Sequence, residues 1–131
     1  KEQWLEDPSW TVYVMISNEE SEKLADHIIH RRCTYIPYLG KNDHPADIHD
    51  VSYVEISENK ELGCMINSLN PCDGINFDMS EATFKYEEFL PICLDSELNQ
   101  HELQKFILTD AIAEDVKVTV YKAEDKNIVF C

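Results

Sequence analysis

The chain has 131 residues, of which 44% are hydrophobic and 10% aromatic, enough to fill the core of one domain. Eleven basic residues face 26 acidic ones, and a net charge of −15 makes the chain as a whole a poor partner for nucleic acid. No run approaches the roughly 20 apolar residues of a membrane-spanning helix, and the first residues lack the apolar stretch of a signal peptide. We therefore expect a single cytosolic domain over residues 1–131, with no membrane partner.

The cysteines argue against a disulfide framework. They are odd in number, widely spaced, and form no C-x-x-C pair, so a zinc ribbon is not indicated either. We expect reduced thiols, mostly buried. The five are Cys33, Cys64, Cys72, Cys93 and Cys131.

The first predicted elements are a strand and a helix. Residues 10–16 are rich in β-branched and aromatic side chains and are apolar on both faces, which predicts an interior strand. Ser17 and Glu20 then stand at capping-box spacing, and the helix that follows should run to about Arg32. Its buried face would hold Leu24, Ala25, Ile28 and Ile29.

The middle of the chain is predicted to contain a loop, a strand and a second irregular stretch. Two prolines, a glycine and an Asn-Asp pair make residues 33–48 a structured loop rather than a helix. Residues 51–56 alternate in polarity, which predicts a strand with one face more exposed to solvent than the other. Turn signals recur throughout residues 57–78, which we expect to be irregular, as an inserted loop would be.

The last third predicts further strands and a second helix. Residues 84–92 are strand-like, and Pro91 confines that strand to an edge or ends it. Apolar residues at helical spacing predict a helix over 97–108, and residues 116–121 and 127–130 predict a hairpin. Together these elements predict an α+β fold: a small, mostly antiparallel sheet with two helices.

His27, His30 and Cys33 recur at three-residue spacing and could present metal ligands on a helix face. The alternative is an amphipathic helix with surface histidines. No cluster of further ligands follows downstream, so we favour the second interpretation and expect no metal.

The loop also carries His44, Asp47 and His49, which could act as ligands or as an acid–base group. A polar loop stiffened by hydrogen bonds from side chains to backbone explains the same residues. The chain has no G-x-S-x-G motif, no glycine-rich phosphate loop and only three glycines. We therefore expect a non-catalytic protein without a cofactor.

Aromatic residues are the better candidates for a functional surface. Aromatic side chains are enriched at the centres of protein–protein interfaces, although most of those in this chain would simply fill the core. We expect one or two at a partner surface. The candidates are Trp4, Trp10, Tyr35, Tyr38, Tyr86 and Phe89.

Three segments together resemble one family. Residues 3–14, QWLEDPSWTVYV, are similar to a QWL-x-x-PS motif that leads into a strand, and residues 35–48, YIPYLGKNDHPADI, resemble the more specific YPYLGKNDHFA-x-I loop. The C-terminal part is similar at residues 85–92, 98–102 and 127–131. The family is the Cas-five family of type I-B CRISPR effector complexes, and the matches correspond to its later part.

The resemblance implies a fold and a role. In that family an N-terminal ferredoxin-like domain of the RAMP type binds RNA, and the subunit caps the 5′ handle of the guide RNA beside the large subunit and the first backbone subunit. That N-terminal domain has no counterpart in this sequence, whose acidity also opposes a role in holding RNA.

Two functional hypotheses follow, and an unrelated acidic interaction domain is a third alternative. The first is an anti-CRISPR decoy, encoded by a phage or prophage, that binds a type I-B effector subunit and blocks assembly; the large subunit is the favoured partner. The second is part of a genuine Cas-five subunit that caps the guide RNA. The candidate partner-binding residues, all in the loop at 35–48, are Tyr35, Tyr38, Lys41, Asn42 and His44. A purely structural loop folded over the sheet is the alternative for them.

Overall fold

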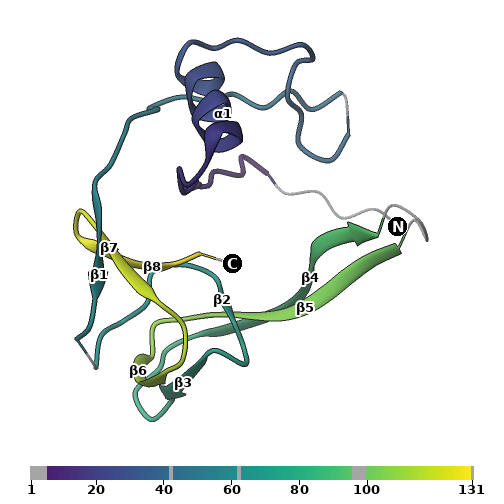
Figure 1. Cartoon of the computed structure of the whole chain (residues 1–131). Helices are drawn as coiled ribbons and strands as arrows, with labels where there is room; N and C mark the ends of the chain where they lie inside the picture. The colour runs from purple at the N-terminus through teal and green to yellow at the C-terminus, as the bar shows by residue number, and fades with distance from the viewer. Residues whose placement is uncertain (1–5, 42, 62, 96–99, 131) are drawn as a thin grey trace, which may run out of the picture. The chain divides into compact units, whose positions relative to one another are not determined.

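The structure is a computed structural model that describes residues 6–41, 43–61, 63–95 and 100–130 (Figure 1). The chain divides into two compact units, Lys1–Tyr53 and Val54–Cys131. The first unit contains the single helix of the described residues, and the second contains all of the described strands. The fold is therefore of the α+β kind with antiparallel pairing throughout, but only one helix is present in the part described.

In the first unit, helix α1 spans Glu19–Ile29. Asn18, rather than Ser17, is its N-cap: the Asn18 side chain accepts a hydrogen bond from the Ser21 backbone N–H at 2.8 Å, and the Ser21 hydroxyl oxygen accepts one from the Asn18 N–H at 3.0 Å. The predicted capping box was therefore displaced by one residue. The helix ends at Ile29, before the predicted Arg32, because Arg31 adopts a left-handed φ of 51°.

Two further predictions for the first unit were wrong. Helix α1 buries none of its residues, and Leu24 is about half exposed. Residues 10–16, the predicted interior strand, form no strand with any described segment, and neither do residues 51–55 of the predicted strand at 51–56. A strand needs a neighbour for its backbone groups, and residue-type propensity alone does not supply one.

The described residues of the second unit form three small antiparallel sheets (Figure 1). Strands β1 (Ile56–Asn59), β7 (Val120–Ala123) and β8 (Lys126–Val129) form the first in the order β1-β7-β8. Strands β2 (Asn70–Pro71), β5 (Gln100–Thr109) and β4 (Lys85–Asp95) form the second in the order β2-β5-β4. Strands β3 (Ile75–Asp78) and β6 (Ile112–Val116) form the third.

The observed strands can be compared with the remaining predictions for this unit. The predicted strand at 84–92 is confirmed as β4, which lies at a sheet edge and has a register shift between Pro91 and Cys93. A hairpin is present as β7–β8, in which Ala123 pairs with Lys126. Its second strand agrees with the predicted residues 127–130, but only residues 120–121 of the predicted first strand at 116–121 lie in β7. The segment 57–78 contains most of β1 and all of β2 and β3, with irregular backbone between them.

The second predicted helix is wrong: β5 occupies residues 100–109 of the predicted 97–108, and residues 97–99 lie outside the described part. Apolar spacing in this segment also fits a strand, because consecutive Phe106 and Ile107 point to opposite faces and both are buried. Pairing along the whole of β4 gives β5 its backbone partners. Tertiary pairing therefore decides between two structures that the local pattern allows.

The core of the second unit lies where the short strands meet. Ile66 is 1% exposed, and it packs with buried residues of β3, β6, β7 and β8. These are Ile75, Ala113, Val120 and Val129, with Cys64, Phe77, Val116 and Val118 packed against them. Within the described part of the chain, no helix is both long and apolar enough to cross a membrane.

Candidate protein-binding loop

The candidate loop at 35–48 is closed by its own backbone. Tyr38 and Pro45 form an antiparallel bridge, the Leu39 N–H donates to the His44 carbonyl at 2.8 Å, and the Ala46 N–H donates to the Pro37 carbonyl at 2.9 Å. These bonds give the loop a small hairpin-like structure, in agreement with the structured loop that its prolines and turn residues predict.

Gly40 lies at the turn of this loop. Its φ of 75° is in the left-handed region, which glycine adopts without steric cost, and a Cβ added there would meet no atom within 4 Å. The chain therefore makes a tight turn at Gly40. It requires the backbone freedom of glycine rather than the absence of a side chain.

The predicted contact residues in the loop fall into three groups. Tyr35 is 84% exposed and Tyr38 is 55% exposed, so both rings are accessible. Lys41 is exposed and His44 is half-buried, with its Nε2 3.6 Å from an Asp43 carboxylate oxygen. Asn42 lies outside the described residues.

Two apolar neighbours of these residues were missed from the sequence. Ile36 is 73% exposed and Leu39 is 41% exposed. Their alternation with Tyr35 and Tyr38 in a stretch stiffened by Pro37 is the signal that could have identified them. Together the four side chains, Tyr35, Ile36, Tyr38 and Leu39, form what we call the loop patch.

The histidine groups weighed as possible metal ligands or acid–base groups form local contacts in the described residues. His30 Nδ1 lies 2.8 Å from the Asp26 carbonyl oxygen, and His49 Nδ1 lies 2.8 Å from an Asp50 carboxylate oxygen. No group of three or more His, Cys, Asp or Glu side chains among those described could hold a metal ion. The histidines therefore make local contacts at the surface.

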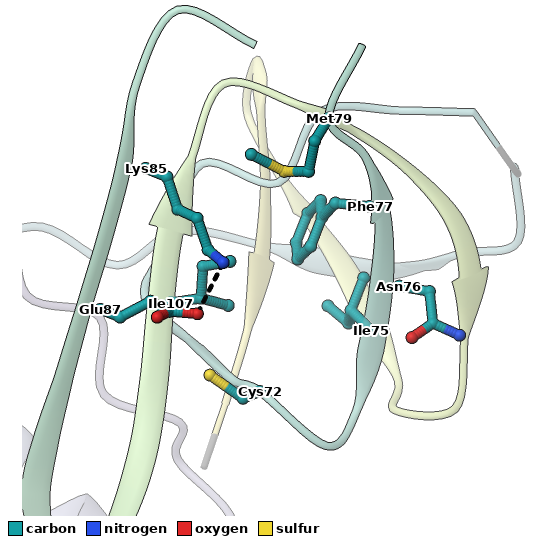
Figure 2. Close-up of a pocket in the computed structure, with 8 residues that line it drawn as sticks. All are labelled: Cys72, Ile75, Asn76, Phe77, Met79, Lys85, Glu87 and Ile107. Atoms are coloured by element: carbon teal, nitrogen blue, oxygen red, sulfur yellow. Dashed lines mark ion pairs between the residues drawn. The ribbon is translucent and has the colours of Figure 1, made fainter.

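A hollow of about 210 Å³ lies on the second unit, between β3 and the β4–β5 pair (Figure 2). Glu87 lies on its wall and forms ion pairs with Lys85 at 2.8 Å and Lys105 at 2.9 Å. Its lining residues are Cys72, Ile75, Asn76, Phe77, Met79, Lys85, Glu87 and Ile107.

The pKa values of titratable groups at and beside the hollow are shifted by burial and by their neighbours. Hydrogen bonds from Lys85 and then Lys105 hold the pKa of Glu87 below its usual value, and the bond to Glu87 raises the pKa of Lys105. Burial raises the pKa of the Cys72 thiol. A nucleophilic thiol or amine needs the opposite shift, so Cys72 and Lys105 are poorly suited to that role.

The fold therefore defines an α+β chain of small antiparallel sheets that presents an exposed, backbone-braced loop patch. Comparisons of the chain with models of protein families, with curated proteins and with solved structures found no match.

Proposed function

We propose that this chain is a non-catalytic protein-binding domain that docks through the loop patch on a subunit of a type I-B CRISPR effector complex. The large subunit is the partner we favour, and binding to it would prevent the complex from assembling. The observation that carries the proposal is the exposure of Tyr35 and Tyr38 on a loop whose backbone is already braced. The same loop is the most specific of the segments that resemble the Cas-five family.

The geometry of the loop suits protein binding. Aromatic side chains dominate the energetic centres of protein interfaces, and a loop fixed before binding loses little entropy when it docks. Tyr35 and Tyr38 combine large apolar area with a hydroxyl that can bond to a partner. Ile36 and Leu39 add apolar area beside them.

The charge of the chain favours a protein partner over RNA. A net charge of −15 repels phosphate, and a protein that holds a guide RNA must neutralise that phosphate with Lys and Arg. The same charge steers the chain toward basic protein surfaces, including surfaces that otherwise face RNA. A relative of the capping subunit that keeps a docking surface but repels the guide would act as a decoy.

A pull-down with separately purified type I-B effector subunits, with and without guide RNA, tests this proposal. We expect the chain to retain the large subunit without RNA or backbone subunits. Recovery of a complete complex loaded with RNA would show instead that the chain is part of a working Cas-five subunit. Failure to retain any effector subunit would contradict both functions.

Variants of the loop patch test where the partner binds. Replacing Tyr35 and Tyr38 together by alanine should weaken binding to the large subunit at least about tenfold, because each removes a large exposed anchor. The control is Tyr53→Ala, which removes a tyrosine that is 68% exposed but lies outside the loop. Equal binding by the double variant and the control would favour a purely structural role for the loop.

A further inference from the structure

A second feature of the first unit lies outside the loop patch. Residues 8–18, PSWTVYVMISN, form an uncharged stretch in a chain of which 28% is charged. Acidic residues border it on both sides, with Glu6 and Asp7 before it and Glu19, Glu20 and Glu22 after it. The acids that follow favour the start of α1, but those that precede belong to no described helix or strand.

Within this stretch, residues 10–16 belong to no helix or strand of the described structure. No hydrogen bond among the described residues reaches this segment, and it joins no ladder. Its β-branched and aromatic residues favour an extended, paired conformation. A segment with strong strand propensity and a row of unpaired N–H and C=O groups is suited to pair with another strand.

The side chains of this segment alternate in exposure as those of a strand do. Val12 is 78% exposed and Val14 is 48% exposed, whereas Tyr13 and Met15, between and after them, are partly buried. Trp10 and Ile16 continue the exposed row. Tyr13 and Met15 on one face of the segment are therefore partly covered, and the other face presents four large apolar side chains at a spacing of two.

We propose that residues 10–16 add as an extra strand to the open edge of a β-sheet in the protein that this chain binds. In strand addition, main-chain hydrogen bonds supply affinity and pockets for alternate side chains supply specificity. The row Trp10, Val12, Val14 and Ile16 would fill those pockets. The acidic residues at both ends select a sheet edge flanked by basic side chains. This inference rests on the proposed function, since it assigns a second contact to the same partner.

A second copy of this chain is a less suitable partner for residues 10–16 than a different protein with a basic sheet edge. Two copies of the segment paired antiparallel would bring Glu6 and Asp7 of one near Glu19 and Glu20 of the other, and like charges side by side oppose association. Each copy also carries a net charge of −15. A heterologous partner with basic residues beside its sheet edge meets neither obstacle.

A proline scan of the full chain against the purified large subunit tests the inference. Single replacements at Thr11, Val12, Tyr13, Val14 and Met15 each remove one N–H. In an edge strand only alternate N–H groups face the neighbour. We expect proline to weaken binding to the large subunit at least about tenfold at alternate positions, either 11, 13 and 15 or 12 and 14. Proline at the other set of positions should weaken binding clearly less. Because residues 10–16 donate no hydrogen bond within the described structure and Thr11, Val12 and Val14 are exposed, thermal unfolding of these three free proline variants should stay close to wild type. Alanine replacements at the same five positions are the matched controls, because they remove each side chain, including the partly buried Tyr13 and Met15, but keep the N–H.

Amide hydrogen exchange gives a second readout on the wild-type chain. The amides of residues 10–16 should exchange fast in the free protein, and alternate ones should become protected when the large subunit is added. Protection of these amides in the free chain would overturn the inference, because the backbone would already be paired.

The outcomes separate this inference from the proposed function. If wild type captures the large subunit and the proline variants bind equally well, or weaken without alternation, strand addition is wrong and the loop-patch proposal stands. If the wild-type chain captures no effector subunit, both strand addition and the proposed function are wrong. A dimer seen by light scattering and abolished by the proline variants would make a second copy the occupant, and would overturn the choice of partner.

Discussion

At the scale of single residues, the Asp110 carboxylate organises the chain reversal that leads into β4. It accepts hydrogen bonds from the Thr83 N–H at 3.0 Å, from the Phe84 N–H at 3.3 Å and from the Thr83 hydroxyl. The hydroxyl bond, followed by the two backbone bonds, holds the pKa of Asp110 below its ordinary value. The ionised form is therefore the one that stabilises this turn.

Asp110→Asn should lower the melting temperature at pH 7, because the charged acceptor is lost while the size of the side chain is kept. A carboxyl whose pKa is lower in the folded state stabilises the fold above its unfolded pKa, and that contribution disappears as the pH falls through the folded pKa. The difference between variant and wild type should therefore shrink below about pH 4. Thermal unfolding followed by circular dichroism from pH 7 downward measures it.

Asp125→Asn is the matched control for this prediction. Asp125 is exposed in the β7–β8 turn, so the same change of charge should have little effect there. A melting temperature of Asp110→Asn equal to that of wild type at pH 7 would show that the carboxylate does not hold the turn.

At the scale of elements, α1 depends unusually strongly on its cap. The helix has 11 residues and none of them is buried. Helices of this length are marginal in water without tertiary packing, so local bonds at the N-terminus carry a large share of their stability. The reciprocal bonds of Asn18 and Ser21 satisfy donors that the first turn leaves open.

Asn18→Ala should therefore cost about 1 kcal/mol of helix stability and reduce the helical signal in far-ultraviolet circular dichroism. Ser17→Ala is the matched control, since the Ser17 side chain takes no part in the observed cap. A larger loss of signal in Ser17→Ala than in Asn18→Ala would restore the capping box predicted from Ser17 and Glu20.

The elements that could be predicted from the sequence are those fixed by strong local signals. The helix, β4 with its edge proline, and the β7–β8 hairpin all follow from caps, alternation or turn residues. Strand β5 could not be separated from a helix, because Phe106 and Ile107 fit either period and only the pairing with β4 decides. The short strands β2 and β3 carry too few residues to show a pattern.

The candidate site was predictable in part for the same reason. Tyr35 and Tyr38 stood out as aromatics in a loop rich in turn residues, and both are exposed. The prediction for residues 10–16 was wrong because their composition indicates only that the segment favours a strand. Composition does not say which chain supplies the neighbouring strand, and pairing depends on residues distant in sequence or in another molecule.

At the scale of the whole molecule, acidity and exposed apolar surface act together. In the first unit none of the described residues is buried, and the apolar residues at 10–16 and in the loop patch are largely open. Such surface is characteristic of contact with another protein, and we propose that the net charge of −15 directs the chain toward basic partners. Binding to a partner should therefore bury both segments.

The most direct measurement of the decoy function is a competition during assembly. Purified type I-B effector subunits and guide RNA would be combined with increasing amounts of the chain, and the products separated by size and identified by mass spectrometry. We expect the complete complex to decline as a species that contains the chain and the large subunit grows, and the Tyr35→Ala/Tyr38→Ala variant to need at least about tenfold more protein for the same effect. An undiminished yield of complete complex, with the chain either excluded or incorporated, would contradict the decoy function.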